Sequence, residues 1–438
     1  AGSTTASSPY SGSVVSLKIT RKRKHDMYYS TVGWDMLNEY TECEVIGKGS
    51  YGEVVSAKSV DSIVAIKRVE ILEDNQSSDW ENGLRLLREI HFLKNLKHPN
   101  LQSLLSLFPN NPDNSFSFRQ VYIVSEFYRE GSLSTFSPSS VSEILSIQFQ
   151  LLSALSYLHA NDVIHRDVKR ENIFVQKGGR KTHIVLGDFG LTRKTCSSMT
   201  SEVVTKPYRC PSLLFGETHY GGEVDVFAAG LCLLEMMLGK TSSTILPNRK
   251  IGLANFVKHQ LAICGGFIPK PKCRLTQLAA AMHLDLSELD IGVSDPQKVF
   301  DFDDRMVLEW RNQIMSEIDS NLQRIGATCK KMVLLKSLCF ELIRFDPSER
   351  ISADAALTQY FVGSKHSMPE KDDSVGEYFD GEIRPLSSDE DRGLAVKEFI
   401  WQFVTDSGMY RNCSLSEIFS NEQIPIAKRT RSRLTQIK

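Results

Sequence analysis

A short stretch at residues 165–172, with the sequence His-Arg-Asp-Val-Lys-Arg-Glu-Asn, contains side chains that suit chemistry on a phosphate group. Asp167 can accept the hydrogen bond of an attacking hydroxyl, and Lys169 can steady the phosphoryl group that is transferred. Asn172 and, further along the chain, Asp188 of Asp-Phe-Gly offer oxygen ligands for a magnesium ion. A surface loop with solvated charges is the alternative interpretation, but the spacing of both motifs together favours phosphoryl transfer to a hydroxyl.

A glycine-rich motif lies upstream, between two segments that are typical of β-strands. The motif is Gly47-Lys48-Gly49-Ser50-Tyr51-Gly52, with Val54 behind it, and a second strand over 62–69 carries Ala65 and Lys67. Glycines between two strands allow the backbone to bend over phosphates and to donate amides to their oxygens. A solvated strand lysine is the alternative for Lys67, and the apolar residues beside it argue against this.

The composition is that of a globular protein, with 41% hydrophobic and 24% charged residues. The 52 basic and 53 acidic side chains nearly cancel, so we expect no direct contact with nucleic acid. The nine cysteines are scattered without a Cys-x-x-Cys pair, which indicates a reducing compartment. The longest apolar run, at 226–238, is too short to cross a bilayer, and the first residues lack the apolar region of a signal peptide. We therefore expect a buried helix there, no membrane association, and a nuclear and/or cytoplasmic location.

Together the two motifs resemble those of eukaryotic protein kinases, and the resemblance runs from about Gly47 to about Arg350. It implies an α+β fold of two lobes, with a small β-rich N-lobe and a large α-helical C-lobe. It also implies ATP and Mg²⁺ as cofactors and proteins as substrates. The residues that it assigns to nucleotide binding are Gly47, Lys48, Gly49, Ser50, Tyr51, Gly52, Val54, Ala65, Lys67, Glu89, Glu126, Tyr128 and Phe174.

Several of these roles are specific. By resemblance, Lys67 pairs with the α and β phosphates and with Glu89, while the carbonyl of Glu126 and the amide of Tyr128 read the adenine. Phe174 is expected to form the floor of the adenine pocket. Ser125 falls at the gatekeeper position, and so small a side chain predicts sensitivity to bulky adenine analogues.

The segment over 200–211 resembles the activation segment of cyclin-dependent kinases and lacks the Thr-x-Tyr pair of mitogen-activated protein (MAP) kinases. The resemblance implies that phosphorylation of Thr200 activates the chain. A phosphate there needs several guanidinium groups to hold it, and the family draws them from the positions of Arg88, Arg166 and Arg193.

The same segment carries further expectations that rest on the resemblance. Thr205 is expected to hydrogen-bond Asp167 and Lys169, and Val204 and Arg209 to form a pocket for a proline after the phosphorylated residue. In the glycine-rich loop, Ser50 and Tyr51 match the inhibitory phosphorylation pair of cell-cycle kinases.

Leucine and isoleucine recur at helical spacing at 84, 87, 90 and 93, which predicts an amphipathic helix that carries Glu89. We expect a turn at Asn82-Gly83 before it. The helix lacks the Pro-Ser-Thr-Ala-Ile-Arg-Glu sequence of the best known cyclin binders. A cyclin-like activating subunit is thus a possible partner that the sequence leaves open.

The chain also departs from the family pattern at several positions. Pro207 stands where the group has tryptophan, and Arg170 replaces a customary proline after Lys169. Ser212 stands where the group has the glutamate that pairs with a buried arginine, here Arg350. Since an unpaired buried charge costs about 3–5 kcal/mol, another acceptor must serve Arg350. Gly187 is a further departure, and Asp225 matches the aspartate that braces the catalytic loop.

We divide the chain into a flexible basic arm (1–35), an N-lobe (36–128), a C-lobe (129–364) with an insert at about 240–335, and a C-terminal extension (365–438). Residues 366–393 are acidic and loop-like. Apolar residues at Leu394, Phe399, Ile400 and Phe403 then predict a helix that docks back onto a lobe.

These features favour an active serine/threonine kinase of the cyclin-dependent-like type in the CMGC group. A MAP-kinase-like enzyme and a pseudokinase or scaffold that kept only the fold are the alternatives. The presence of Lys67, Glu89, Asp167, Asn172 and Asp188 together argues against a scaffold, which has no physical need for all of them.

Overall fold

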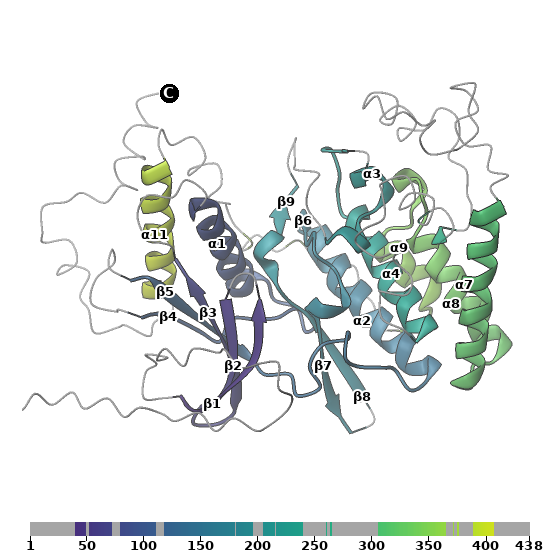
Figure 1. The fold of residues 1–438 in the computed structure, drawn as a ribbon, viewed down its shortest axis with the longest axis horizontal. Coiled ribbons are helices and arrows are strands. Elements are labelled where there is room, and N and C mark those ends of the chain that lie inside the picture. The colour runs from purple at the N-terminus through teal and green to yellow at the C-terminus, as the bar shows by residue number, and fades with distance from the viewer. Residues whose placement is uncertain are drawn as a thin grey trace, which may run out of the picture. The chain divides into compact units, whose positions relative to one another are not determined.

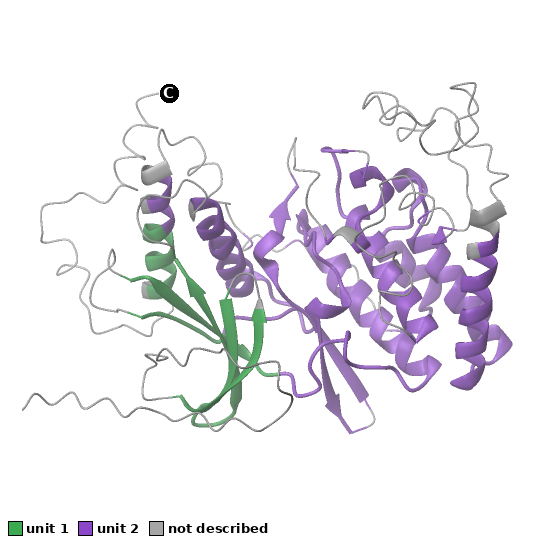
Figure 2. Ribbon diagram, viewed as in Figure 1, with its two compact units in different colours: residues 1–79, 105–127, 397–438 green, residues 80–104, 128–396 purple. Residues whose placement is uncertain are grey.

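The computed structural model describes residues 40–49, 52–71, 79–110, 118–179, 181–195, 205–214, 216–239, 260, 263–264, 305–364, 371, 375 and 389–406. The chain divides into two compact units (Figure 2). Unit 1 comprises residues 1–79, 105–127 and 397–438, and unit 2 comprises residues 80–104 and 128–396. Residues 80–104, which the sequence analysis placed in the N-lobe, therefore group with the larger unit.

Unit 1 is built on an antiparallel sheet in the order β1-β2-β3-β5-β4 (Figure 1). The strands are β1 (Thr41–Gly49), β2 (Gly52–Lys58), β3 (Ile63–Glu70), β4 (Ser106–Pro109) and β5 (Gln120–Glu126). Burial alternates along β2 and β3, as expected for strands that turn one face to a core. The strand predicted over 62–69 corresponds to β3.

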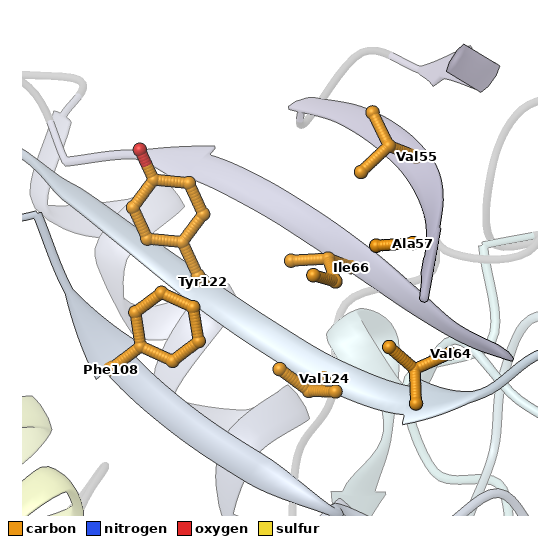
Figure 3. Packing of buried hydrophobic residues seen from close by; sticks show 7 residues of the cluster. All are labelled: Val55, Ala57, Val64, Ile66, Phe108, Tyr122 and Val124. Atoms are coloured by element: carbon orange, nitrogen blue, oxygen red, sulfur yellow. The ribbon is translucent and has the colours of Figure 1, made fainter. Parts of the chain in front are cut away.

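One face of this sheet carries the hydrophobic core of the unit (Figure 3). The cluster consists of Val55, Ala57, Val64, Ile66, Phe108, Tyr122 and Val124. The rings of Phe108 and Tyr122 stack at 5.0 Å, and Tyr40 stacks on Phe108 at 5.8 Å. The aromatic pairs add a geometric preference to the burial of apolar area on this face. The opposite face is left for other contacts.

Unit 2 is mainly helical (Figure 1). Its longer helices are α1 (Asp79–Asn95), α2 (Val141–Ala160), α4 (Glu223–Leu238), α7 (Arg305–Arg324), α8 (Cys329–Leu342) and α9 (Ala353–Tyr360). Its strands are β6 (Val163–Ile164), which pairs with β9 (Arg193–Lys194), and β7 (Ile173–Gly178), which pairs with β8 (Lys181–Leu186). A short helix α3 (Pro211–Leu214) precedes α4, and α11 (Asp389–Asp406) lies in the C-terminal extension.

Helices α2 and α4 form the centre of unit 2. Helix α4 is buried along nearly its whole length, which confirms the buried helix predicted from the apolar run at 226–238. Helix α2 is long and apolar enough to span a membrane, but it packs against α4, α9 and β8 as a core helix. Its N-terminus is capped by Ser140, whose hydroxyl accepts the Glu143 amide at 3.2 Å.

The α+β class is confirmed, with a β-sheet N-terminal region and a helical C-terminal region. Two local expectations were wrong. Helix α1 begins at Asp79 and includes Asn82 and Gly83, which the sequence analysis assigned to a turn. Helix α11 begins at Asp389, inside the segment that was expected to be a loop. Both errors arose at residues with weak helix propensity, where packing decides the outcome.

Candidate active site

The catalytic loop follows β6 and ends in a 3₁₀ turn, Arg170–Asn172, and it places Asp167 at the centre of a hydrogen-bonded cluster. Lys169 Nζ lies 2.6 Å from Asp167 Oδ2, and Asn172 Nδ2 donates to the same oxygen at 3.0 Å. Thr205 Oγ1 donates to Asp167 Oδ1 at 2.7 Å and accepts from Lys169 Nζ at 3.1 Å. The structure thus brings together four residues that the sequence analysis assigned to catalysis and metal binding.

The electrostatics of this cluster keep Asp167 ionised. Burial acts to raise the pKa of the Asp167 carboxyl, but the charge of Lys169 and the hydrogen bonds from Lys169 and Thr205 outweigh it, so the pKa lies below its usual value. The carboxylate is therefore an acceptor at neutral pH. Because its basicity is low, it is better suited to orienting a hydroxyl than to removing a proton before attack.

Asp225 on α4 holds the backbone of the catalytic loop. Its carboxylate accepts the amide of His165 at 2.8 Å through Oδ2 and the amide of Arg166 at 2.8 Å through Oδ1. The side chain is 1% exposed, so both bonds are shielded from water. Arg166 has a φ of 65°, which is uncommon outside glycine, and the bond to its amide helps to stabilise this conformation.

Two of the three arginines expected to hold a phosphate, Arg88 and Arg193, act electrostatically on the third, Arg166. The pKa of Arg166 is lowered by burial first, and the positive charges of Arg88 and Arg193 lower it further. Arg166 Nε donates to the carbonyl of Leu191 at 2.7 Å, and Nη1 donates to the hydroxyl of Tyr220 at 3.4 Å. Positive charges that act on one another in this way favour the binding of an anion.

Asn172 and Asp188 fit the chemistry of a magnesium site. The amide nitrogen of Asn172 donates to Asp167 at both the carbonyl and the carboxylate, which leaves the amide oxygen as the ligand end. The amide of Gly187 donates to the Asn172 carbonyl at 2.9 Å and ties the two segments together. Mg²⁺ is commonly bound by one or two protein oxygens with substrate phosphates and water. In the described part of the chain, no larger group of His, Cys, Asp or Glu gathers as a metal cluster.

In unit 1, the strand register assembles the residues that were assigned to the nucleotide. Val54 pairs with Lys67 and Ala65 pairs with Ser125, so these side chains share one face of the sheet. It is the face opposite the hydrophobic core, because Val64 and Ile66, which alternate with them, belong to the core cluster. Glu126, whose carbonyl is expected to contact the adenine, is the last residue of β5.

The glycine-rich motif forms the connection between β1 and β2. Gly47, Lys48 and Gly49 end β1, and Gly52 begins β2 and pairs with Gly49. Gly52 has a φ of 144°, and a Cβ on it would lie 2.0 Å from the carbonyl oxygen of Arg68. Only glycine fits there, which agrees with a loop that bends tightly.

In unit 2, Phe174 on β7 stacks on Tyr128 at 5.4 Å with nearly parallel rings. Glu89 is buried on α1. Four assigned residues, Ser50, Tyr51, Thr200 and Val204, lie outside the described residues. Arg209 is described, and its carbonyl accepts the side-chain amide of Gln260.

The structure identifies the acceptors that serve Arg350. Its guanidinium donates to the main-chain carbonyls of Arg344 at 2.7 and 3.0 Å, Glu223 at 2.7 Å and Phe345 at 3.4 Å. It also lies over the ring of Phe227, 4.9 Å from the centroid. Main-chain carbonyls therefore accept the hydrogen bonds of Arg350 in place of the missing glutamate. Ser212, at the position of that glutamate, is buried, and its hydroxyl lies 3.2 Å from Cys210 Sγ.

The structure also explains two other positions at which the chain departs from the family pattern. Arg170 is 5% exposed and donates to the carbonyl of Leu133 from Nε at 3.0 Å and from Nη2 at 2.6 Å, and to that of Phe136 at 3.1 Å. It thereby links the catalytic loop to the segment at 133–136. A Cβ on Gly187 would lie 2.3 Å from Gln102 Oε1 and 2.8 Å from the Phe174 ring, so the tight packing requires glycine.

The sequence analysis missed two residues that support the loop. His159 Nε2 lies 3.0 Å from Asp225 Oδ2, and Tyr220 contacts Arg166 as described above. Their partners are 66 and 54 positions away in the chain, so no local spacing could reveal them.

Comparison with known proteins agrees with this geometry. The protein kinase domain matches residues 40–362. Cyclin-dependent kinase-like 1 of Caenorhabditis elegans is 38% identical over 212 residues, which cover 47% of this chain and 56% of the relative. Cyclin-dependent kinase-like 4 of Mus musculus is 38% identical over 212 residues, covering 47% of this chain and 58% of the relative. The chain thus spans somewhat over half the length of these relatives.

A third relative matches over a longer range. The mitogen-activated protein kinase homolog MMK2 of Medicago sativa is 28% identical over 365 residues, covering 82% of this chain and 85% of the relative. Protein kinases use ATP and Mg²⁺ as cofactors, and the residues described above fit both. The chain therefore belongs to the eukaryotic protein kinase family, and these relatives place it in the CMGC group.

Proposed function

We propose that the chain is an active serine/threonine protein kinase that transfers the γ-phosphate of ATP to protein substrates. The observation that carries this proposal is the cluster of Asp167, Lys169, Thr205 and Asn172 around one ionised carboxylate. A scaffold that only binds partners has no need for a buried, desolvated carboxylate held by a lysine and a hydroxyl.

In the proposed mechanism, Asp167 accepts the hydrogen bond of the substrate hydroxyl and orients its oxygen toward the phosphate. Lys169, 2.6 Å from Asp167, places a positive charge where negative charge develops during transfer. Asn172 and Asp188 would hold Mg²⁺, and Lys67 and Glu89 would position the ATP phosphates. The bound Mg²⁺ supplies neutralisation of the phosphate charge.

We place the substrate class at Ser or Thr followed by Pro, because 200–211 resembles the corresponding cyclin-dependent kinase segment. A phosphate on Thr200 is the proposed activating signal, and the action of the Arg88 and Arg193 charges on Arg166 supports it. Phosphates on Ser50 or Tyr51 would repel ATP and inhibit. A MAP-kinase-like enzyme is the second candidate, since the plant MAP kinase homolog matches over 82% of the chain.

The test is transfer of phosphate from ATP to paired Ser-Pro and Ser-Ala peptides by the purified full chain with Mg²⁺. We expect activity that needs phosphorylated Thr200, favours Ser-Pro, falls strongly in Thr200→Ala and is absent in Asp188→Asn. Asp188→Asn is the matched control because it removes one oxygen ligand charge and keeps the side-chain shape.

The outcomes separate the alternatives. ATP binding without any transfer from the Thr200-phosphorylated chain would favour a scaffold. Undiminished activity of Thr200→Ala would refute the proposed switch, and equal use of both peptides would refute proline direction.

A further inference from the structure

Gln260 is a buried polar side chain in the segment over 240–335, which the sequence analysis predicted as an insert. The residue is 1% exposed, and its carbonyl accepts the amide of Cys264 at 2.8 Å, which is the hydrogen bond of one helical turn. Ile263 and Cys264 in the same turn are also buried. Glutamine is mostly found at the protein surface, so its burial at this position needs a physical reason.

The side-chain amide of Gln260 is bonded to the segment that is expected to bind the substrate. Nε2 donates to the main-chain carbonyl of Arg209 at 2.5 Å, across 51 positions of the chain. Oε1 is also buried and has no hydrogen-bond partner within the part of the chain that the structure describes. A buried acceptor without a partner destabilises the folded state, so an apolar side chain would fill this space more favourably. The bond to Arg209 is therefore what distinguishes glutamine from an apolar residue here.

The residues on both sides of Arg209 are held by other contacts. Tyr208 is buried, and its hydroxyl donates to Glu235 Oε2 on α4 at 2.9 Å. Cys210 is fully buried, whereas the side chain of Arg209 is half-buried. The peptide plane between Arg209 and Cys210 keeps some rotational freedom as long as its carbonyl has no partner. The bond from Gln260 removes this freedom and fixes the main chain at Arg209.

The segment that contains Arg209 is continuous with the catalytic cluster. The 3₁₀ turn Lys206–Tyr208 directly precedes Arg209, and the amide of Tyr208 donates to the Thr205 carbonyl at 2.8 Å. The hydroxyl of Thr205 donates to Asp167 Oδ1 at 2.7 Å. A peptide whose hydroxyl is bound at Asp167 would therefore place its next residue close to this segment.

We propose that Gln260 is a positioning residue for substrate selection, which holds the main chain of Arg209 so that Arg209 can form the pocket for a proline after the phosphorylated residue. The inference rests on the proposed kinase function and on the proline direction proposed with it. It gives the segment over 240–335 a part in the choice of substrate. Gln260 acts through Arg209 and does not itself touch the reacting atoms.

The test compares Gln260→Met with the wild type, both as the full chain phosphorylated on Thr200, on the paired Ser-Pro and Ser-Ala peptides. Methionine fills a similar space and lacks both the donor and the unpartnered oxygen, so the urea midpoint should stay within about 0.2 M of the wild type. We expect the ratio of kcat/KM for Ser-Pro over Ser-Ala to fall about tenfold. The loss should appear as a higher KM for the Ser-Pro peptide, with an unchanged KM for ATP.

Gln148→Met is the matched control, because Gln148 on α2 has a similar environment away from the substrate segment. It is fully buried, its Nε2 donates to the Ala229 carbonyl at 3.4 Å, and its Oε1 has no partner among the described residues. The same substitution there should leave the peptide ratio unchanged. Gln260→Glu is a second variant, which keeps the shape of the side chain and replaces the donating nitrogen with an oxygen. It should also lose the preference for Ser-Pro.

Hydrogen exchange provides a measurement that needs no activity. The amides of Tyr208 and Leu214 donate within the segment, to the carbonyls of Thr205 at 2.8 Å and Cys210 at 3.3 Å. Both amides should exchange about tenfold faster in Gln260→Met than in the wild type. Unchanged exchange would show that Gln260 does not hold the segment and would overturn the inference.

The peptide data decide the remaining alternatives. An unchanged peptide ratio in Gln260→Met, or an equal fall in Gln148→Met, would overturn the role in substrate selection. A lower urea midpoint with an unchanged ratio would do the same, because it would leave Gln260 a purely structural role. A wild-type chain that binds ATP but transfers no phosphate, or that uses both peptides equally, would count against the proposed function on which the selection rests. Hydrogen exchange would then still decide whether Gln260 holds Arg209.

Discussion

Arg170 offers a direct test of how this chain replaces the customary proline of its family. Its guanidinium spans two carbonyls, those of Leu133 and Phe136, at distances of 2.6 to 3.1 Å. The side chain is buried, so replacement by methionine keeps much of the volume and removes every donor. The two carbonyls then lose their charged partner in a site that water reaches poorly.

The expected loss in the free energy of unfolding follows from the number of acceptors that Arg170 serves. A hydrogen bond from a charged group contributes about 1.5–3 kcal/mol, and the two donors to Leu133 share one oxygen. Main-chain bonds from Leu133 to Ile173 at 2.7 Å and from Val175 to Gly131 at 2.9 Å stay in place and hold the segment. We therefore expect Arg170→Met to lower the free energy of unfolding by about 3 kcal/mol.

Urea unfolding of the full chain measures this loss. With a slope of about 3 kcal/mol per molar urea, the midpoint should fall by about 1 M. Arg170→Lys is the control, because it keeps the charge but lacks the planar fork that reaches both carbonyls, so its midpoint should lie between those of Arg170→Met and the wild type. A midpoint of Arg170→Met within about 0.2 M of the wild type would refute the reasoning.

Two further predictions concern α1 and the nucleotide. Burial lowers the pKa of His91 from 6.5 to about 4, so the folded state disfavours the protonated imidazole. The free energy of unfolding is therefore highest above pH 6.5 and falls as the pH drops toward 4. At pH 5 the free energy of unfolding should be about 2 kcal/mol lower than at pH 7.5. The variant His91→Gln should lose this part of the pH dependence of unfolding. An identical pH dependence in the variant would contradict the prediction. Ser125 is buried and pairs with Ala65, so bulky adenine analogues should inhibit the wild type, and Ser125→Phe should weaken that inhibition by roughly tenfold or more. Equal inhibition of both proteins would show that Ser125 does not border the adenine pocket.

The catalytic cluster could be predicted because most of its contacts are local. Asp167, Lys169 and Asn172 lie in one loop, and their side-chain bonds span only two to five residues. Thr205 came from the resemblance, since nothing in the spacing places it 2.7 Å from Asp167. The register of β2, β3 and β5 follows from alternation, which puts Lys67 opposite the core face.

The partners of the buried arginines could not be predicted, for a physical reason. Arg350 and Arg170 are served mainly by main-chain carbonyls, and every residue has one. Residue identity therefore says nothing about which carbonyls lie nearby. The sequence analysis expected an acceptor other than the missing glutamate for Arg350 without naming it, and the structure supplies main-chain carbonyls.

Gly83 weakens helix α1 locally, and a contact with a residue far along the chain explains its presence there. The sequence analysis assigned it to a turn, because glycine weakens a helix and follows asparagine there. In the structure it lies inside α1, where a valine from a segment some 300 residues away in the chain occupies the space of a side chain. Where a sequence breaks a local rule inside an ordered element, the compensating partner lies elsewhere in the molecule or is added to it. For Gly83 in α1, that partner is Val396 of α11.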